Sequence, residues 1–248
     1  MIELVDISKT FDNGIEKVEV LKPVSIKMNA GESIVIIGGN GAGKSTLLNI
    51  ISGNLKPTTG QIKIDGVDVT KMPRHKRAAH VACVFQDPNS GVCPDMSIAE
   101  NLAMALSRGK KRLLGRAIKR QHLEVFKEKL VTFNPELKDR LNQKVSLLSG
   151  GQRQVITLLM ATLQKPQLLL LDEHISALDP KIAKQVMEIT RSLINEQKIT
   201  TIMITHNLKD AVAYADRLIM FSAGRITMDV SGDEKKKLTP AKLVTKFE

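Results

Sequence analysis

Hydrophobic residues follow two different spacings along the chain, and the first is typical of β-strands. Residues 2–7 alternate apolar and polar side chains, and residues 33–37 form a short apolar run rich in Ile and Val. Asp65-Gly66 separates two apolar stretches and is typical of a two-residue hairpin turn. Strands are predicted at 2–7, 18–21, 24–28, 33–37, 61–64, 67–69, 81–85, 168–171, 200–205 and 218–221, with a last one after Gly224. The first three fit an antiparallel sheet beside a second, buried sheet.

The second spacing is helical and dominates residues 97–164, where Ile98, Leu102 and Leu106 recur every four positions. Further helices are predicted over 46–53, 180–197 and 208–214, with a last one from Pro240. Strands and helices alternate after residue 165, which is typical of an open parallel sheet. The chain is therefore expected to be an α/β protein with a helical segment inserted between two halves of its core.

Composition narrows the classes of partner. The 248 residues suit one α/β domain, and the formal net charge of +11 is compatible with nucleic acid, an anionic membrane surface or plain solubility. Aromatic residues make up only 3%, which disfavours base stacking on single-stranded nucleic acid. The basic blocks at 108–120 and 235–237 are expected to be solvated helical faces, with anionic lipid headgroups as the alternative for the first.

The sequence shows neither a membrane-spanning segment nor a cysteine pattern typical of disulfides or metal sites. No apolar run approaches the ~18 residues of a membrane span, so any membrane work is expected to fall to a partner. Cys83 and Cys93 lack metal-ligand spacing and are expected to be reduced thiols of a cytosolic protein.

One stretch carries an explicit chemical pattern. Residues 38–45 read Gly-Gly-Asn-Gly-Ala-Gly-Lys-Ser, the Gly-x-x-x-x-Gly-Lys-[Ser/Thr] phosphate-binding template, between a predicted strand and a predicted helix. Glycines leave backbone N–H groups free to converge on phosphates, and the helix adds its positive N-terminal end. Lys44 is expected to reach the β- and γ-phosphates, and the Ser45 hydroxyl to ligate Mg²⁺.

Two further stretches fit the same chemistry. Asp172 and Glu173 follow the apolar run 168–171, at the strand end where open α/β sheets bind ligands. Asp172 is expected to hold Mg²⁺ opposite Ser45, and Glu173 to act as general base on the water that attacks the γ-phosphate. Residues 148–152 read Leu-Ser-Gly-Gly-Gln before a helix, which indicates either a second anion site or a simple helix cap.

Together these stretches resemble the ATP-binding subunit of an ATP-binding-cassette (ABC) transporter. Residues 38–45 match the Walker A motif of that family, 168–173 match Walker B, and 148–152 match its signature motif letter for letter. Gln86 stands at the Q-loop position, residues 176–179 match the D-loop, and His206 stands at the switch-histidine position. Phe11 lies where an aromatic residue usually stacks on adenine. The motifs occur in the family's order and span nearly the whole chain.

The resemblance implies a set of site residues and a mode of assembly. The residues expected to contact ATP are Phe11, Gly38, Asn40, Gly41, Ala42, Gly43, Lys44, Ser45, Thr46, Ser149, Gly150, Gly151, Gln152 and Asp179. The Mg²⁺ ligands are expected to be Ser45, Gln86 and Asp172, and the catalytic residues Glu173, His206 and Gln86. Two copies are expected to pair head to tail, so that the signature of one covers the ATP of the other.

The implied fold is a P-loop NTPase, RecA-like core with an antiparallel β subdomain and an inserted α-helical subdomain. The whole chain, 1–248, is expected to be one ABC ATPase domain: 1–88 and 165–248 form the core and β subdomain, and 89–164 the helical signature subdomain. Departures from the family pattern are Gly39 and His174, each where Pro is frequent, and Phe11 in place of the commoner Tyr, which can stack but not hydrogen-bond.

The expected partners are transmembrane permease subunits on the cytoplasmic face of the cell membrane, an extracytoplasmic substrate-binding protein if the system is an importer, and no specific nucleic acid. Residues 172–174 and 177–181 are similar to those of amino-acid importers of the tryptophan/tyrosine or branched-chain type. The alternatives are a soluble cassette ATPase acting on DNA or ribosomes, which the net charge favours, and a module that binds ATP without hydrolysing it. Glu173 and His206 argue against the last of these.

Overall fold

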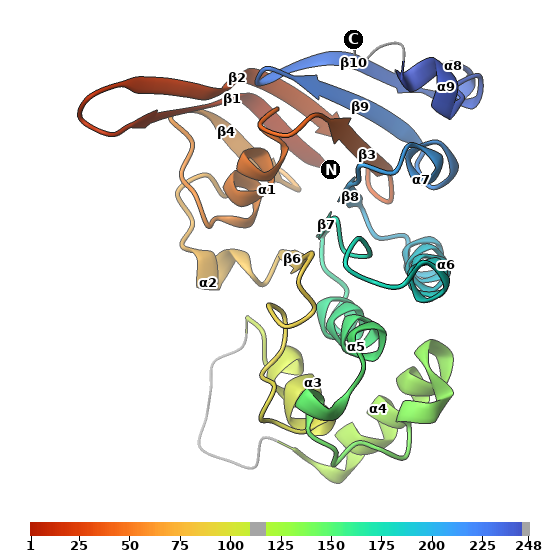
Figure 1. The fold of residues 1–248 in the computed structure, drawn as a ribbon. Helices are drawn as coiled ribbons and strands as arrows, with labels where there is room; N and C mark the ends of the chain where they lie inside the picture. Colours follow the sequence, from red (N-terminus) through yellow and green to blue (C-terminus); the bar gives the residue numbers. More distant parts are fainter. Residues whose placement is uncertain (110–117, 245–248) are drawn as a thin grey trace.

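The computed structural model of the chain describes residues 1–109 and 118–244 (Figure 1). The strands are β1 (Ile2–Asp12), β2 (Lys17–Met28), β3 (Ser33–Gly38), β4 (Thr59–Ile64), β5 (Val67–Asp68), β6 (Val81–Val84), β7 (Leu168–Asp172), β8 (Thr201–Ile204), β9 (Arg217–Ser222) and β10 (Arg225–Ser231). The helices are α1 (Lys44–Ser52), α2 (Arg74–Arg77), α3 (Ile98–Leu106), α4 (Arg120–Phe133), α5 (Gly150–Thr162), α6 (Pro180–Gln197), α7 (Leu208–Ala213), α8 (Gly232–Lys236) and α9 (Pro240–Val244), with 3₁₀ turns at Pro135–Leu137 and Val145–Leu147.

The strands form two sheets. The first is antiparallel, with the order β2-β1-β4-β5, and it includes the predicted Asp65-Gly66 hairpin. The second has the order β10-β9-β3-β8-β7-β6, in which β9 to β6 run parallel and β10 joins the edge antiparallel to β9. Because β6, β7, β8 and β3 are parallel neighbours, the loops after them emerge at one edge of this sheet.

The alternation of side chains along the parallel strands separates two hydrophobic cores. In β3, Ile34 and Ile36 pack with α1 and the antiparallel sheet, whereas Val35 and Ile37 pack with the helices on the opposite face. A strand buried on both faces must be apolar throughout, which explains the continuous run of Ile and Val. The helix α1 therefore lies in the layer between the two sheets (Figure 1).

The inserted helices α3, α4 and α5 form the lower part of the molecule in Figure 1 and pack around the buried Phe126, Leu130 and Leu158. Ser97 and Ser149 begin α3 and α5, and each forms a capping box with the residue three positions later. In the basic block at 108–120, four of the residues lie outside the described part of the chain: Lys110, Lys111, Arg112 and Arg116.

The α/β fold class is confirmed, and three local predictions were wrong. The two strands expected around Lys22-Pro23 form one strand, β2, because β2 is a sheet edge where a missing N–H is tolerated, and its register against β1 shifts near Pro23. Strand β1 continues to Asp12 because the β1–β2 hairpin extends beyond the alternating residues. Helix α1 begins at Lys44 rather than at residue 46, which places the lysine in the first helical turn.

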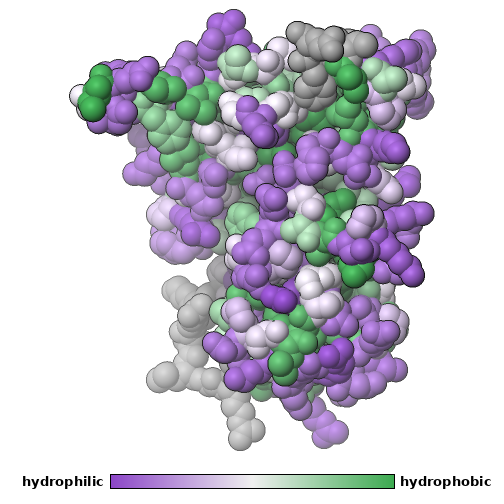
Figure 2. Space-filling view, in the orientation of Figure 1, coloured by the Kyte–Doolittle hydropathy of each residue, from purple (hydrophilic) through white to green (hydrophobic). Residues whose placement is uncertain are grey.

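The surface is mostly hydrophilic on the face shown in Figure 2, where a hydrophobic spot marks the far end of the β1–β2 hairpin. Ile15, at that end, is 95% exposed. Among the helices of the described ranges, none combines the length and the apolarity that crossing a membrane requires.

Candidate functional site

The phosphate-binding loop leaves β3 and enters α1 through two glycines, Gly38 and Gly43, at which a side chain is unfavourable. A Cβ on Gly38 would collide with the carbonyl oxygen of Phe221 on the neighbouring strand. Gly43 is the N-cap of α1 with φ of 98°, and a Cβ there would lie 3.1 Å from the carbonyl oxygen of Val20. The loop is thus held between both sheets, with Gly39, Asn40, Gly41 and Ser45 exposed to solvent, Thr46 half-buried and Ala42 buried.

Lys44 is the buried cation of this loop. Its Nζ atom donates hydrogen bonds to the carbonyl oxygens of Gly38, at 2.8 Å, and Gly39, at 2.9 Å. Burial lowers the pKa of Lys44, and the charges of Glu173 and then Asp172 act in the opposite direction. The ammonium group therefore lies within the electrostatic reach of both carboxylates, without a direct ion pair to either among the described residues.

Four predicted site residues occur directly after adjacent parallel strands. Asp172 ends β7, Glu173 follows it, His206 lies two residues after β8, and Gln86 lies two residues after β6. Burial raises the pKa of the Asp172 carboxyl, Glu173 raises it further, and Lys44 opposes both. The strand order thus brings Lys44, Asp172, Glu173 and His206 together, while Gln86 lies exposed at the far strand of the group.

Glu173 is held by its backbone as well as by its carboxylate. Its φ of 46° lies in the left-handed region, which is strained for a residue with a side chain. The Glu173 N–H donates to the carbonyl oxygen of Ile204 at 3.1 Å, and its own carbonyl accepts from the N–H and the hydroxyl of Ser176. The Glu173 Oε2 atom lies 3.3 Å from Nδ1 of His206, so the two side chains form a pair.

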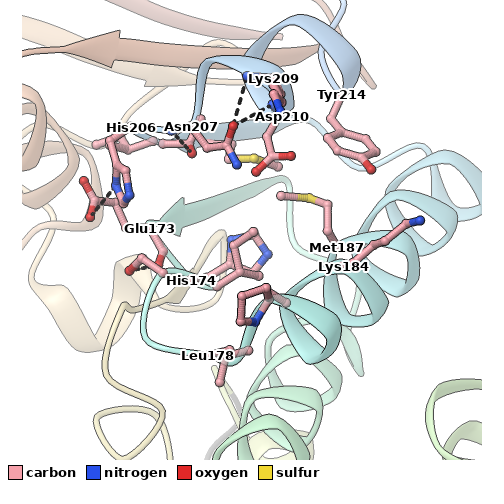
Figure 3. A pocket seen from close by; sticks show the side chains of 17 residues that line it. Glu173, His174, Leu178, Lys184, Met187, His206, Asn207, Lys209, Asp210 and Tyr214 are labelled. Atoms are coloured by element: carbon pink, nitrogen blue, oxygen red, sulfur yellow. Dashed lines mark hydrogen bonds and ion pairs between the residues drawn. The ribbon is translucent and has the colours of Figure 1, made fainter.

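A hollow of about 640 Å³ opens behind this pair, between α6 and α7 (Figure 3). In Figure 3, Glu173 and His206 lie on one side of it and Met187, Lys184 and Tyr214 on the other. Sequence patterns did not indicate this hollow, because only one wall comes from motif residues, such as Glu173 and His206, and the opposite wall is formed by the surfaces of α6 and α7. We call it the Glu173 hollow.

His174 lies in the wall of the Glu173 hollow and is fully buried. Its Nε2 atom is 3.2 Å from the hydroxyl of Thr190, and that hydroxyl already donates to the carbonyl oxygen of Val186 at 2.7 Å. The hydroxyl can therefore only accept from the ring, so Nε2 carries the proton of a neutral imidazole. Burial lowers the pKa of His174 to about 4, in agreement with that neutral form.

The signature residues lie elsewhere. Ser149 is the N-cap of α5, with its hydroxyl accepting from the Gln152 N–H at 3.3 Å, and Gly150 and Gly151 form the first turn. A second hollow of about 690 Å³, beside α4 and α6, is lined by Ser149, Gly151 and Gln152 and shares no lining residue with the Glu173 hollow. Ser149 therefore caps α5, and no described contact joins this segment to the phosphate-binding loop of the same chain.

Two more predicted residues, Phe11 and Asp179, have no described contact with Lys44. Phe11 lies on β1 with its ring 42% exposed, and the Nζ atom of Lys9 sits 5.0 Å from the ring centroid. Asp179 is the N-cap of α6, where its carboxylate accepts from the Lys181 N–H at 2.9 Å. Neither has a described contact with the phosphate-binding loop.

Arg77 is a buried residue that the sequence analysis missed. Its guanidinium donates to the carbonyl oxygens of Ile50, at 2.8 Å, and Ile51, at 3.2 Å, in the last turn of α1, and to that of Thr70, at 2.9 Å. It thereby ties the end of the phosphate-loop helix to the segment after β5. The basic run at 74–77 gave no signal of this, since such runs are usually solvated.

The oxygen donors predicted to hold Mg²⁺ fit that ion. Asp172 and Ser45 offer a carboxylate and a hydroxyl beside Lys44, Gln86 offers an amide from the neighbouring strand end, and Mg²⁺ in phosphate-binding sites takes one or two carboxylates plus phosphate and water oxygens. The partial burial that raises the pKa of Asp172 is the effect that a cation would reverse.

Known proteins resemble this chain throughout its length. A family model described as ABC transporter matches residues 21–176. A protein named tyrosine transport ATP-binding protein, from Clostridioides difficile strain R20291, is 45% identical over 100% of this chain and 99% of its own length. The spermidine/putrescine import ATP-binding protein PotA of Haemophilus influenzae is 34% identical over 94% of this chain, which spans 59% of PotA.

Solved structures agree. A dimeric structure of the ATP-binding cassette MJ0796, in a post-hydrolysis state bound to ADP and Pi, superimposes with a TM-score of 0.78 at 28% identity, covering 93% of this chain and 98% of that one. A nucleotide-free ATP-binding cassette from an ABC transporter gives a TM-score of 0.77 at 27% identity, covering 96% and 93%. These likenesses confirm the expected P-loop NTPase fold.

Proposed function

The chain belongs to the ABC transporter family, as its ATP-binding, ATP-hydrolysing subunit, and we propose that the sheet edge around Lys44 is the site at which ATP is cleaved to drive transport. The observation that carries this proposal is the strand order. It brings Lys44, Asp172 and the Glu173–His206 pair to the carboxyl ends of the neighbouring strands β3, β8 and β7. A phosphate loop, a carboxylate for a metal and a second carboxylate for a water are the parts that phosphoryl transfer to water needs.

Binding begins with the phosphates. The N–H groups of residues 39–45 donate hydrogen bonds to the phosphates, and the positive N-terminal end of α1 stabilises their negative charge. Lys44 replaces its hydrogen bonds to Gly38 and Gly39 with hydrogen bonds to phosphate oxygens. Asn40, Gly41, Ala42, Gly43 and Thr46 complete this cradle. Ser45, Asp172 and Gln86 would hold Mg²⁺, which would supply charge neutralisation for the phosphates.

Hydrolysis is assigned to Glu173. Its carboxylate accepts the proton of the attacking water, while His206, 3.3 Å away, holds that carboxylate in place and faces the γ-phosphate. The ordered backbone of Glu173 limits its motion, so the base is oriented before the substrate arrives. Gln86, at the exposed end of the group, contacts the metal or the water.

A second copy completes the site. Ser149, Gly150, Gly151 and Gln152 do not reach the phosphate loop of their own chain, so we propose that they cover the ATP of a partner copy in a homodimer, with Asp179 communicating between the sites. The dimeric form of the MJ0796 cassette supports this assembly. Residues 1–88 and 165–248 then act as core, and 89–164 as the helical subdomain that carries the signature.

The transport partners follow from the relatives. The 45% identical protein is named for tyrosine transport, so we propose an aromatic amino acid as the cargo of this system. Transmembrane permease subunits carry the cargo, with this chain on their cytoplasmic face and an extracytoplasmic binding protein delivering it. The named relatives are transport proteins, and they give no support to action on DNA or ribosomes.

Glu173→Gln tests the proposal. The variant is expected to bind ATP with unchanged affinity, to lose at least about 10²-fold in turnover, and to accumulate as a dimer when ATP saturates it. Phosphate release gives the rate, nucleotide titration the affinity, and light scattering the mass. Glu128→Gln, an exposed acid on α4, is the matched control and should behave as the wild type. Full turnover in Glu173→Gln, or a monomer under saturating ATP, would refute it.

A further inference from the structure

Helix α5 carries more than the signature segment at its start. One turn further along lies Gln154, a polar residue with no exposed surface. Its Nε2 atom donates to the carbonyl oxygen of Phe85 at 3.3 Å, and Phe85 immediately precedes Gln86. The buried amide therefore attaches the residue before the Q-loop glutamine directly to the helix that begins at Ser149.

Two neighbours of Gln154 on α5 strengthen this attachment. Arg153 donates from Nη1 to the Oδ1 atom of Asn89. Thr157 packs so closely on Gly91 that a Cβ at position 91 would collide with its methyl group. Segment 85–91 is thus fastened to α5 at three points, by a buried hydrogen bond, a charge-assisted hydrogen bond and a close packing contact.

The next residues of the segment are held by the helical layer as well. Asn101 on α3 is fully buried, donates to the carbonyl oxygen of Cys93 at 3.0 Å and accepts from the Cys93 N–H at 2.8 Å. Within the described ranges, no hydrogen bond joins residues 86–92 to the parallel sheet. The chain therefore leaves the sheet after Val84, and the hydrogen bonds that hold the following segment from outside come from α5 and α3.

Gln154 also holds an unmet bonding requirement. Its Oε1 atom is buried and has no hydrogen-bond partner within the described part of the chain. A buried acceptor without a donor is unfavourable, so this atom favours any rearrangement of segment 85–91 that turns a backbone N–H towards it. The Gln154 amide thus links segment 85–91 to α5 through one hydrogen bond, and among the described residues its second polar atom, Oε1, is still free to accept another.

We propose that Gln154 is a positioning residue that makes Gln86 follow the signature helix, and so couples the two ATP sites of the dimer. The inference rests on the proposed function: Ser149 of one copy covers the partner's ATP, whereas Gln86 of the same copy serves its own. When α5 of one copy closes over the partner's ATP, it moves Gln86 at the ATP site of its own copy. Binding of ATP at one site therefore affects hydrolysis at the other, and the two sites act cooperatively.

Gln154→Met tests this, because methionine keeps the volume and removes both polar atoms. Wild-type hydrolysis is expected to be cooperative, with a Hill coefficient between about one and two. The variant is expected to show a Hill coefficient of about one and a rate at saturating ATP reduced roughly 5-fold to 150-fold, the range of such couplings. Binding of ATP to the monomeric chain should not change. In a Gln86→Ala background, Gln154→Met should have no further effect.

Two controls isolate the attachment. Thr162→Val changes another buried polar residue of α5, whose hydroxyl bonds only within the helix, and should leave both the rate and the Hill coefficient unchanged. If Gln154→Met does not fold, Asn89→Ala decides the matter, because Asn89 is exposed and its loss removes the contact with Arg153 together with one local hydrogen bond to Asp87. It should lower the Hill coefficient in the same direction.

Three outcomes would overturn the inference: an unchanged Hill coefficient in both variants, equal losses with and without Gln86, or a Hill coefficient of about one in the wild type. Each of these leaves ATP hydrolysis by the wild type intact, so each counts against the coupling alone. Absence of wild-type hydrolysis would instead refute the proposed function.

Discussion

The Nδ1 atom of His206 lies 3.3 Å from the Oε2 atom of Glu173, although the two residues belong to different strand–loop units. The pairing is a direct result of the adjacency of β7 and β8. Glu173 is 24% exposed and His206 is 67% exposed, so the carboxylate faces the interior and the imidazole covers it from the solvent side. The base is thus partly shielded from water by the residue that orients it.

Replacing Lys44 with methionine should weaken ATP binding by about 10- to 100-fold, because hydrogen bonds to charged groups contribute roughly 1.5–3 kcal/mol. The free energy of unfolding should change little, since the lysine pairs only with two loop carbonyls in the free protein. Fluorescent-nucleotide titration and urea denaturation measure the two quantities. The exposed Lys138→Met is the matched control. Tight ATP binding by Lys44→Met would contradict the assignment of the loop.

Phe11→Ala should raise the Kd for ATP about fivefold or more, whereas Phe11→Trp should preserve it, because aromatic stacking on a base contributes about 1–3 kcal/mol. Inorganic triphosphate is the internal control, since it has no base and should bind both variants equally. Lys9 already sits over this ring and must share the exposed face with adenine. Equal losses for ATP and triphosphate would show that Phe11 does not contact the base.

Arg77→Leu should lower the free energy of unfolding by roughly 3 kcal/mol, because several buried carbonyl oxygens lose their donor at once. Urea denaturation measures this loss, with Arg74→Leu as the control, an exposed residue three positions earlier in the same helix. We also expect a weaker affinity for ATP, since the end of α1 is no longer fixed. A stability equal to that of the control would mean that water replaces the guanidinium.

Stability should fall on acidification through His174. Its pKa is about 4 in the folded chain and about 6.5 in the unfolded chain, so between these values only the unfolded state takes up the proton. The stability is therefore complete above pH 6.5 and is lost as the pH falls towards 4, by up to roughly 1.4 kcal/mol per pH unit.

Urea denaturation at several pH values, with His174→Gln beside the wild type, isolates this contribution. The variant should have a flatter profile between pH 6.5 and 4. The exposed His75→Gln serves as the control and should keep the wild-type slope. Parallel profiles for all three proteins would show that His174 is accessible to protons in the folded state.

Local patterns predicted those elements whose boundaries depend on neighbours in sequence. Pro180 fixed the start of α6, which ends at Gln197 as expected, and Asp65-Gly66 formed the expected hairpin. The pairing of Glu173 with His206 could not be predicted from spacing alone, because it depends on which strands are neighbours. Pro23 was misjudged for the same reason, since only the sheet order shows that its strand is an edge.

The sequence also could not predict which polar residues are buried. Arg77 lies in a run of basic residues and Gln154 follows two polar residues, so neither differs from a solvated neighbour in the printed sequence. Both are buried because surfaces from distant segments close over them. Such residues are found only from packing, and here they fasten the phosphate-loop helix and the Q-loop segment.

Gly43 lies where backbone segments from distant parts of the chain meet. The carbonyl oxygen of Val20 approaches it and also Gly224, where a Cβ would lie only 2.7 Å from that oxygen, and the Gly224 N–H bonds to the carbonyl of Ala42 at 3.2 Å. Three main chains meet here, and Gly43 holds a φ of 98°, which strains any residue that has a side chain. An alanine at position 43 would therefore strain the contact between the two sheets, and a failed assay of such a protein would report a disturbed scaffold as well as a lost ligand.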